Sequence, residues 1–237
     1  MENDETLEER LERLRDELTA ACSDAERWRA RCERIDVLGR LGRIEEAELD
    51  AERMVEAVSE GDPWFGSVLR VAGTLSMLSG ATQRAHQTLE RAVAWERTQP
   101  ERPGLALALS VYAMALAQRG ELEDAHGAMD ESVALHRASG DRPALADSLR
   151  RLAGVEYLKG RPRRSAVYAE EAARLLEELG DEIGMAIALY QLGLVYSELG
   201  ANDRAREALE RALTIDGAHG DAMRATLEQT VLAVVEF

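Results

Sequence analysis

Apolar residues follow helical periodicity in successive stretches of the chain, and glycines end these stretches at regular distances. Five of the glycines lie 38, 40, 40 and 40 residues apart. Glycine directly after a periodic stretch commonly ends a helix, because it adopts the left-handed backbone conformation easily. The pattern therefore predicts five helical hairpins, with turns at Gly42, Gly80, Gly120, Gly160 and Gly200.

Small side chains repeat in register with these turns. Five residues after the glycines stand Ala47, Ala85, Ala125, Ser165 and Ala205. Before the turns a leucine is followed four residues later by a small residue, at 69 and 73, 109 and 113, 149 and 153, and 189 and 193. Residues four apart lie on the same helix face. We therefore expect the two helices of each hairpin to pack closely through these positions.

Acidic residues separate one hairpin from the next. Asp24, Asp62, Glu101, Asp141, Asp181 and Asp221 lie 38 to 40 residues apart, and four of them directly follow a glycine. A carboxylate at this place can cap the next helix or oppose its dipole. The predicted helices span residues 24–41, 43–59, 62–79, 81–97, 103–119, 121–138, 141–159, 162–179, 181–199 and 201–215, with one extra helix at each end.

The repeat resembles the tetratricopeptide repeat family over nearly the whole chain. Residues 192–200, followed by Ala205 and Ala212, are similar to its signature, as are residues 113–120 followed by Ala125. The 40-residue period is longer than the family's usual 34 and is similar to kinesin light chains and bacterial regulatory proteins. The first repeat departs most, with Ile35 where a small residue is usual.

This resemblance implies an all-α, right-handed superhelical solenoid of about five hairpins. We expect an N-terminal capping helix in residues 1–22, the solenoid in residues 23–216 and a C-terminal helix in residues 217–237. Solenoid repeats contact only their neighbours, so stability should be distributed along the chain.

The amino-acid composition is typical of a helical protein, and the net charge limits the classes of binding partner. Hydrophobic residues make up 46% of the chain and aromatic residues only 4%, and the net charge is -16. Such a charge disfavours contact with nucleic acid or an anionic membrane surface. The charged start and the absence of a long apolar run predict a cytoplasmic protein, and the use of arginine with one lysine suggests a bacterial source. Cys22 and Cys32 are expected to be ordinary helix residues.

No catalytic or phosphate-binding motif occurs, so we predict neither an enzyme nor a cofactor. His86 and His126 occupy equivalent places in adjacent repeats, too far apart for one metal ion, and an interhelix or surface role is expected. One basic cluster has two interpretations: a solvated face paired with Glu170, Glu171 and neighbouring acids, or a docking site for an acidic segment. It comprises Arg150, Arg151, Lys159, Arg161, Arg163 and Arg164.

The family resemblance implies that the first helix of each pair lines a concave groove. We project groove positions thirteen, ten, six and three residues before each turn glycine, which gives Arg29, Cys32, Asp36 and Gly39 in the first repeat and Ser67, Arg70, Thr74 and Met77 in the second. Residues at these offsets, continued into the C-terminal helix, form the predicted partner-binding site. It consists of Arg70, Met77, Leu107, Met114, Arg150, Tyr157, Ile187, Tyr190, Leu194, Leu227, Val234 and Phe237.

The two ends leave alternatives open. Leu7, Leu11, Leu14 and Leu18 could cover the solenoid end or form an intermolecular coiled coil, and the capping box at Ser23 favours the cover. The apolar C-terminal helix could fold onto the preceding hairpin or remain exposed for a partner or a second copy, as in a homodimer. The function predicted overall is a non-catalytic adaptor that binds another protein or peptide. The alternative is a self-associating regulatory or ligand-sensing subunit that controls a separate enzyme.

Overall fold

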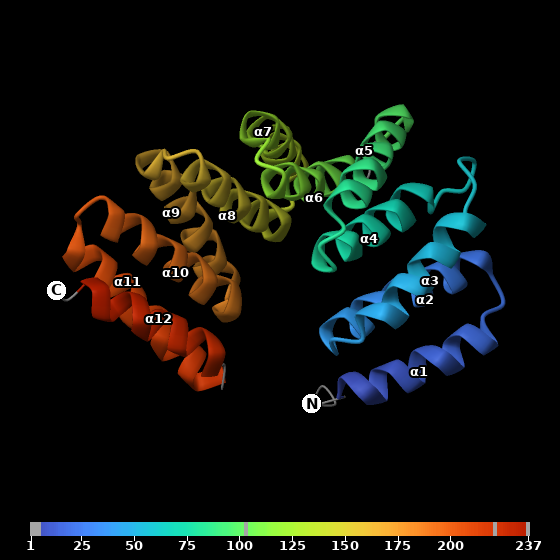
Figure 1. The fold of residues 1–237 in the computed structure, drawn as a ribbon, viewed down its shortest axis with the longest axis horizontal. Helices are drawn as coiled ribbons and strands as arrows, with labels where there is room; N and C mark the ends of the chain where they lie inside the picture. The colour runs from blue at the N-terminus through green and yellow to red at the C-terminus, as the bar shows by residue number, and fades with distance from the viewer. Residues whose placement is uncertain (1–5, 102–103, 220–221, 236–237) are drawn as a thin grey trace. The chain divides into compact units, whose positions relative to one another are not determined.

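The computed structural model describes residues 6–101, 104–219 and 222–235, and within these ranges all regular structure is α-helical (Figure 1). The prediction of an all-α repeat fold is therefore confirmed. The helices are α1 (Leu7–Ala20), α2 (Asp24–Arg40), α3 (Ile44–Ala57), α4 (Phe65–Leu78), α5 (Thr82–Thr98), α6 (Leu105–Gln118), α7 (Leu122–Ser139), α8 (Arg142–Leu158), α9 (Pro162–Leu179), α10 (Glu182–Glu198), α11 (Asn202–His219) and α12 (Ala222–Val235).

The helices fall into two compact units, Met1–Arg119 and Gly120–Phe237. The N-terminal unit holds α1 to α6 and the C-terminal unit α7 to α12, and within each unit helices pack on their neighbours in sequence. The hairpin around Gly120 spans the boundary between the two units. The division into an end helix, a solenoid and a second end helix stays a prediction.

All five predicted turn glycines have a positive φ, between 68° and 80°. A residue with a β-carbon is strained in this conformation, which explains why glycine ends each first helix. Close packing of the hairpins is also as expected. Ala205 is fully buried, and a β-carbon at Gly193 would lie 2.5 Å from Leu209 Cγ. Gly73 meets Leu89 at the same distance in the second hairpin.

At the N-terminus α1 covers the first hairpin. Leu11 and Leu14 are buried in a core shared with α2, and Leu7 and Leu18 pack against it. The Ser23 hydroxyl accepts the Glu26 backbone N–H, and the Glu26 carboxylate accepts that of Ser23, which confirms the capping box. The four leucines thus pack within the chain, as expected of a helix that covers the end of the solenoid.

Two helix boundaries differ from the prediction for identifiable reasons. The helix expected from residue 62 begins at Phe65, because the Asp62 carboxylate accepts hydrogen bonds from Trp28 Nε1 at 3.1 Å and from the Trp64 backbone N–H at 2.8 Å. The helix expected to end at residue 215 continues to His219. Its added turn carries Asp216, which is fully buried.

One buried position, sixteen residues after the turn glycine, is polar in three hairpins. It holds Val58, Glu96, His136, Leu176 and Asp216. The three polar side chains contact the following first helix or the residue before it. Glu96 accepts the Gly104 N–H at 3.1 Å, His136 Nδ1 shares a 2.9 Å hydrogen bond with Ser148, and Asp216 forms a 2.7 Å ion pair with Arg224. Successive hairpins are therefore joined by different polar contacts at the same place.

The C-terminal helix α12 packs on α10 and α11. Val231 and Leu232 are half-buried against the core of the preceding hairpin, whereas half of Leu227 is exposed. The helix thus folds onto the last hairpin and keeps one apolar side chain at the surface. The side chain of Val234 and the whole of Phe237 lie outside the described residues.

Candidate partner-binding surface

In the N-terminal unit the projected groove positions line two cavities. A cavity of about 590 Å³ is bordered by Ser67, Arg70 and Leu107 from α4 and α6. A smaller one of about 220 Å³ is bordered by Arg70 and Thr74 of α4 and by three α2 residues, Cys32, Asp36 and Gly39. Sites that hold whole small molecules usually measure roughly 300 to 1,000 Å³, so the smaller cavity fits a single side chain better than a complete ligand.

Arg70 lines both cavities. Its side chain is half-buried, and no acidic group of the described residues lies within ion-pair distance. Burial lowers the pKa of the Arg70 guanidinium, and the charges of Cys32 and Glu96 oppose this effect. Burial also raises the pKa of the Cys32 thiol to about 11, so the thiol is neutral at physiological pH. The guanidinium is therefore a half-buried donor group in two linings that also contain acidic residues, Asp36 in the smaller and Glu96 and Glu101 in the larger.

The larger cavity also uses residues that lie outside the first helices. Trp95, Glu96, Gln99 and Pro100 come from the end of α5 and the linker that follows it. Burial raises the pKa of Glu96, while the hydrogen bond from Gly104 and the charge of Arg70 lower it. The projection from turn glycines missed these residues because it considered only first helices. The 40-residue period could have indicated these residues, because it exceeds the usual 34 and so leaves longer linkers between hairpins.

The other predicted contacts in this unit are less accessible. Met77 is half-buried and packs against the cluster of Ala85 and Leu89, and Met114 is half-buried on α6. Leu107 is 40% exposed. Of the four residues predicted here, Arg70 and Leu107 therefore border an open cavity.

In the C-terminal unit the predicted positions form an aromatic and aliphatic surface on α8 and α10. Ile187, Tyr190 and Leu194 are half-buried, and Tyr157 is 37% exposed. Burial raises the pKa of the Tyr157 phenol, and so do the charge of the Glu198 carboxylate and the hydrogen bond with it. Tyr157 thus joins the two first helices through a polar contact at the edge of the apolar side chains.

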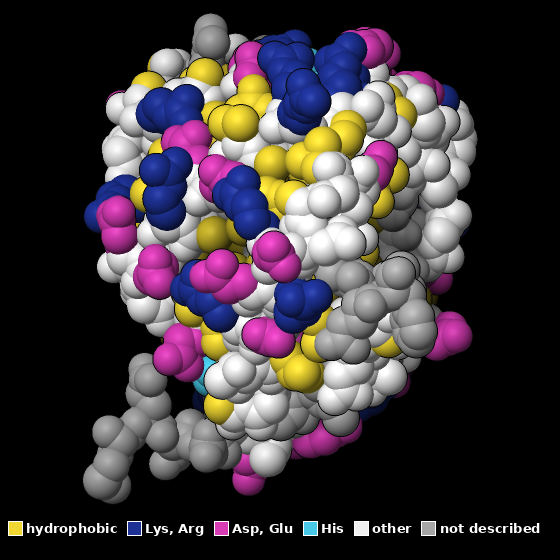
Figure 2. Space-filling view, turned by 90° about the vertical axis from the view of Figure 1, so that its left-hand side faces the viewer, with side chains coloured by type: hydrophobic (Ala, Val, Ile, Leu, Met, Phe, Trp, Pro, Cys, Tyr) yellow, Lys and Arg dark blue, Asp and Glu magenta, His cyan; other side chains and the backbone are white. Residues whose placement is uncertain are grey.

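Figure 2 shows a face of the C-terminal unit on which hydrophobic side chains form a band between arginines and carboxylates. Of the exposed large hydrophobic residues in this unit, Tyr157 and Leu227 were predicted as contacts. A patch of this kind on a charged surface favours contact with another molecule. The other exposed large hydrophobic residues of this unit are Leu158, Val167, Leu179 and Ile183.

The predicted basic cluster is paired within the protein, but with other acids than expected. Arg150 and Arg151 each contact Asp147 at 2.6 Å. Burial alone would raise the pKa of Asp147, but the charges of these arginines and their hydrogen bonds hold it below its ordinary value. Glu170 instead pairs with Arg204 at 3.0 Å, and Glu171 with Arg137 at 2.6 Å.

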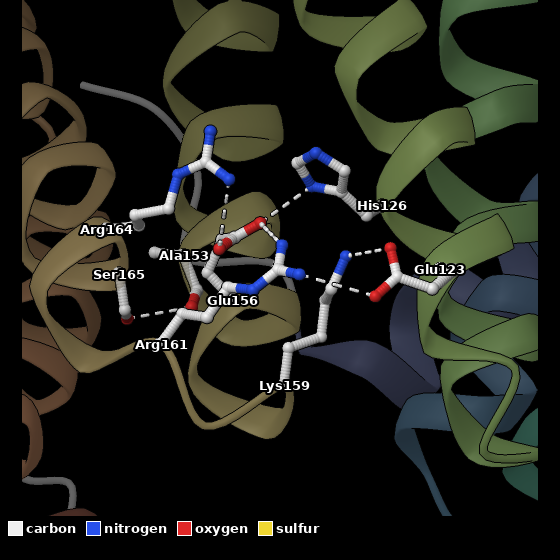
Figure 3. A network of polar contacts seen from close by, with 8 residues as sticks. All are labelled: Glu123, His126, Ala153, Glu156, Lys159, Arg161, Arg164 and Ser165. Atoms are coloured by element: carbon white, nitrogen blue, oxygen red, sulfur yellow. Dashed lines mark hydrogen bonds and ion pairs between the residues drawn. The ribbon is translucent and has the colours of Figure 1, made fainter.

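The other part of the cluster surrounds one buried carboxylate, that of Glu156 (Figure 3). His126 Nδ1 lies 2.8 Å from it, without the alignment of a hydrogen bond, and nitrogen atoms of Arg161 and Arg164 lie at 3.8 and 4.0 Å. Lys159 pairs with Glu123 at 2.7 Å. Because these cations already face carboxylates, the arrangement holds α7, α8 and α9 together and leaves little charge for an acidic partner.

The histidines in equivalent repeat positions bridge helices. His86 Nε2 lies 3.2 Å from the Tyr112 hydroxyl, and His126 faces Glu156. Within the described residues, no three His, Cys, Asp or Glu side chains gather in a way that could hold a metal ion. No described helix has both the length and the apolar character needed to span a membrane.

Comparison with known proteins agrees with this architecture. The family model of the tetratricopeptide repeat matches residues 145–218. No curated protein sequence matches the chain significantly. Solved structures that share the fold include BtubC (BKLC) from P. vanneervenii, with 20% identity, a TM-score of 0.74, and coverage of 92% of this chain and 93% of that one.

Two further structures extend the comparison. One is the structure of the nearly identical TPR-like repeats of a Podosopora anserina protein described as a kinesin light chain. It is 19% identical to this chain, with a TM-score of 0.67, and the match covers 83% of this chain and 97% of that one. Bacillus thuringiensis PlcR, solved in complex with the peptide PapR7 and DNA, shares 13% identity, with a TM-score of 0.71 and coverage of 90% and 76%. The chain is therefore a repeat protein of the tetratricopeptide fold, with that family's sequence signature in residues 145–218.

Proposed function

We propose that this protein is a non-catalytic adaptor that binds a segment of another protein or a peptide along the first-helix faces of its hairpins. The observation that carries the proposal is the coincidence of the projected groove positions with two cavities, where Ser67, Arg70 and Leu107 border one and Arg70 and Thr74 the other. The fold of PlcR, a protein solved with a bound peptide, supports the same role. A cytoplasmic location stays a prediction.

The residues on these surfaces are better suited to binding a peptide than to catalysing a reaction. The larger cavity combines apolar residues with Arg70 and with Gln99 and Glu101 of the linker. Interfaces gain most of their affinity from a few aromatic, aliphatic and arginine contacts of this kind. In the C-terminal unit, Tyr190 and Leu194 offer an apolar complement on α10.

Site-specific photocrosslinking tests the proposal. A photoreactive amino acid is placed at Leu107 or Ile187, on first helices, and as a matched control at Glu90 or Glu210, exposed positions on second helices. The protein is expressed in its native host, irradiated, and its adducts are identified by mass spectrometry. We expect one dominant partner at the first-helix positions and none at the controls. Equal labelling at all four positions would contradict a first-helix interface.

The alternative is a self-associating regulatory or ligand-sensing subunit, including a homodimer through α12. The exposure of Leu227 favours it, since a second copy could cover this side chain. The same crosslinking experiment separates the two functions, because adducts only between copies of this chain would support self-association in place of the adaptor.

A further inference from the structure

Four arginines line a third cavity of the N-terminal unit, which shares no lining residue with the two cavities of the predicted groove. This cavity of about 240 Å³ lies among α1, α2 and α3. Leu18 and Met54 supply its apolar lining. The charged lining consists of Arg27, Arg31, Arg34, Asp50 and Arg53.

The arginines are concentrated by the helical repeat. Arg27, Arg31 and Arg34 stand at positions i, i+4 and i+7 of α2 and therefore share one face of the helix. Arg53 comes from α3, one turn after Asp50. Like charges at this helical spacing destabilise a helix. The repulsion among these arginines must therefore be offset by other contacts.

Pairing within the protein neutralises only part of this charge. Arg34 pairs with Asp50 inside the cavity, and Arg27 pairs with Asp24 at 2.8 Å on the exposed side. Arg31 lies over the Trp28 ring at 5.4 Å from its centroid, which fixes its direction but brings no negative charge. Neither Arg31 nor Arg53 has a carboxylate within ion-pair distance among the described residues. The lining holds four guanidinium groups and one carboxylate, in a chain of net charge -16.

We propose that this cavity binds a phosphoryl group, either as inorganic phosphate or as the phosphate of a small monoester. A guanidinium presents paired N–H donors that match the oxygens of a phosphate, which lysine cannot do. The two charges of a phosphate dianion equal those of Arg31 and Arg53, whereas a carboxylate would balance only one. The volume lies below that of sites for whole small molecules. A monoester would therefore place its phosphate inside and its remainder outside.

Isothermal titration calorimetry on the full-length protein tests this site. The probes are inorganic phosphate and glycerol 3-phosphate at a pH where both are dianions, with acetate as a monoanion control at the same ionic strength. We expect saturable one-to-one binding of at least one phosphate compound and much weaker binding of acetate. If only inorganic phosphate binds, the ligand is the free ion; if glycerol 3-phosphate binds at least as well, it is a monoester. If neither compound saturates the protein at concentrations up to about 10 mM, any binding is too weak to act as a site, and the proposal is overturned.

Matched variants locate the binding. In Arg31→Gln/Arg53→Gln we expect affinity to fall about tenfold or more, because two charge-assisted contacts are lost. Arg15→Gln/Arg174→Gln removes the same charge from exposed positions of α1 and α9 that do not line the cavity, and its affinity should stay within about twofold of the parent. An equal loss in both variants would show diffuse charge attraction and contradict a built site.

A second substitution keeps the test decisive if the glutamine variant fails to fold, as judged by circular dichroism. Arg31→Lys/Arg53→Lys retains both charges but cannot contact two phosphate oxygens with one planar group. We expect clearly weaker phosphate binding in this variant. Affinity equal to that of the parent would show that arginine geometry is irrelevant and would overturn recognition by the guanidinium groups.

Discussion

At the scale of single residues, His136 shows how burial fixes a protonation state. The residue is 8% exposed, and its Nδ1 atom lies 2.9 Å from the Ser148 hydroxyl, which in turn lies 3.2 Å from the Ser132 hydroxyl. Burial lowers the pKa of His136, and the charges of Asp141 and Asp147 oppose this only in part. The imidazole is therefore neutral in the folded protein at pH 7.

This environment predicts a pH dependence of stability. Because the folded pKa of His136 lies below its unfolded value of about 6.5, the unfolded chain binds the proton more readily. The contribution of His136 is complete above pH 6.5 and is lost as pH falls through and below that value. When the pH is lowered from 7.5 to 5.5, the free energy of unfolding should decrease less in His136→Gln than in the parent, by on the order of 1 kcal/mol. Thermal unfolding at the two pH values measures this difference. An identical loss in both proteins would mean that His136 is protonated without penalty.

Sequence alone predicted the positions that depend on local chemistry and missed those that depend on contacts across repeats. Gly193 and Ala205 could be placed because small residues at fixed offsets have one physical use, close helix packing. The partners of Arg150 and Lys159 could not, because Asp147 and Glu123 compete with many other acids and only the folded geometry selects among them. The lining of the larger cavity escaped prediction for a related reason: periodicity does not fix the path of the linker that carries Gln99 and Pro100.

At the scale of helices, the C-terminal helix is attached by charge as well as by apolar contact. Asp216 on α11 is fully buried and pairs with Arg224 on α12 at 2.7 Å, while Val231 and Leu232 supply the apolar part. A buried carboxylate that loses its cation is costly, whereas an exposed ion pair contributes little. The attachment of α12 should therefore depend strongly on one arginine.

We predict that Arg224→Ala lowers the free energy of unfolding by about 3 kcal/mol, the lower end of the range for breaking a buried pair, since part of the Arg224 side chain reaches solvent. The matched control is Arg211→Ala, which breaks an exposed 3.1 Å pair with Glu177 and should cost about 0 to 1 kcal/mol. Chemical denaturation of both variants measures the difference. Similar small losses would show that α12 relies on its apolar side chains alone.

At the scale of the whole molecule, stability should be distributed, because helices pack mainly on their sequence neighbours in each unit. A chain truncated after Gly180, which removes α10 to α12, is expected to remain soluble and helical and to melt at a lower temperature than the full chain. Circular dichroism during heating tests this expectation. A fully unfolded product would identify the last three helices as the nucleus on which the remainder depends.

The buried position that holds Val58, Glu96, His136, Leu176 and Asp216 has a consequence for how the chain assembles. Repeats of one shape could in principle stack in a wrong order during folding, or exchange between molecules at high concentration. Here the three polar side chains make different contacts, because Glu96 accepts a backbone N–H of Gly104, His136 shares a hydrogen bond with Ser148 and Asp216 pairs with Arg224. The repeats are therefore alike in outline but differ in the chemistry of their junctions, and a buried carboxylate or imidazole moved to another junction would need a new polar partner there.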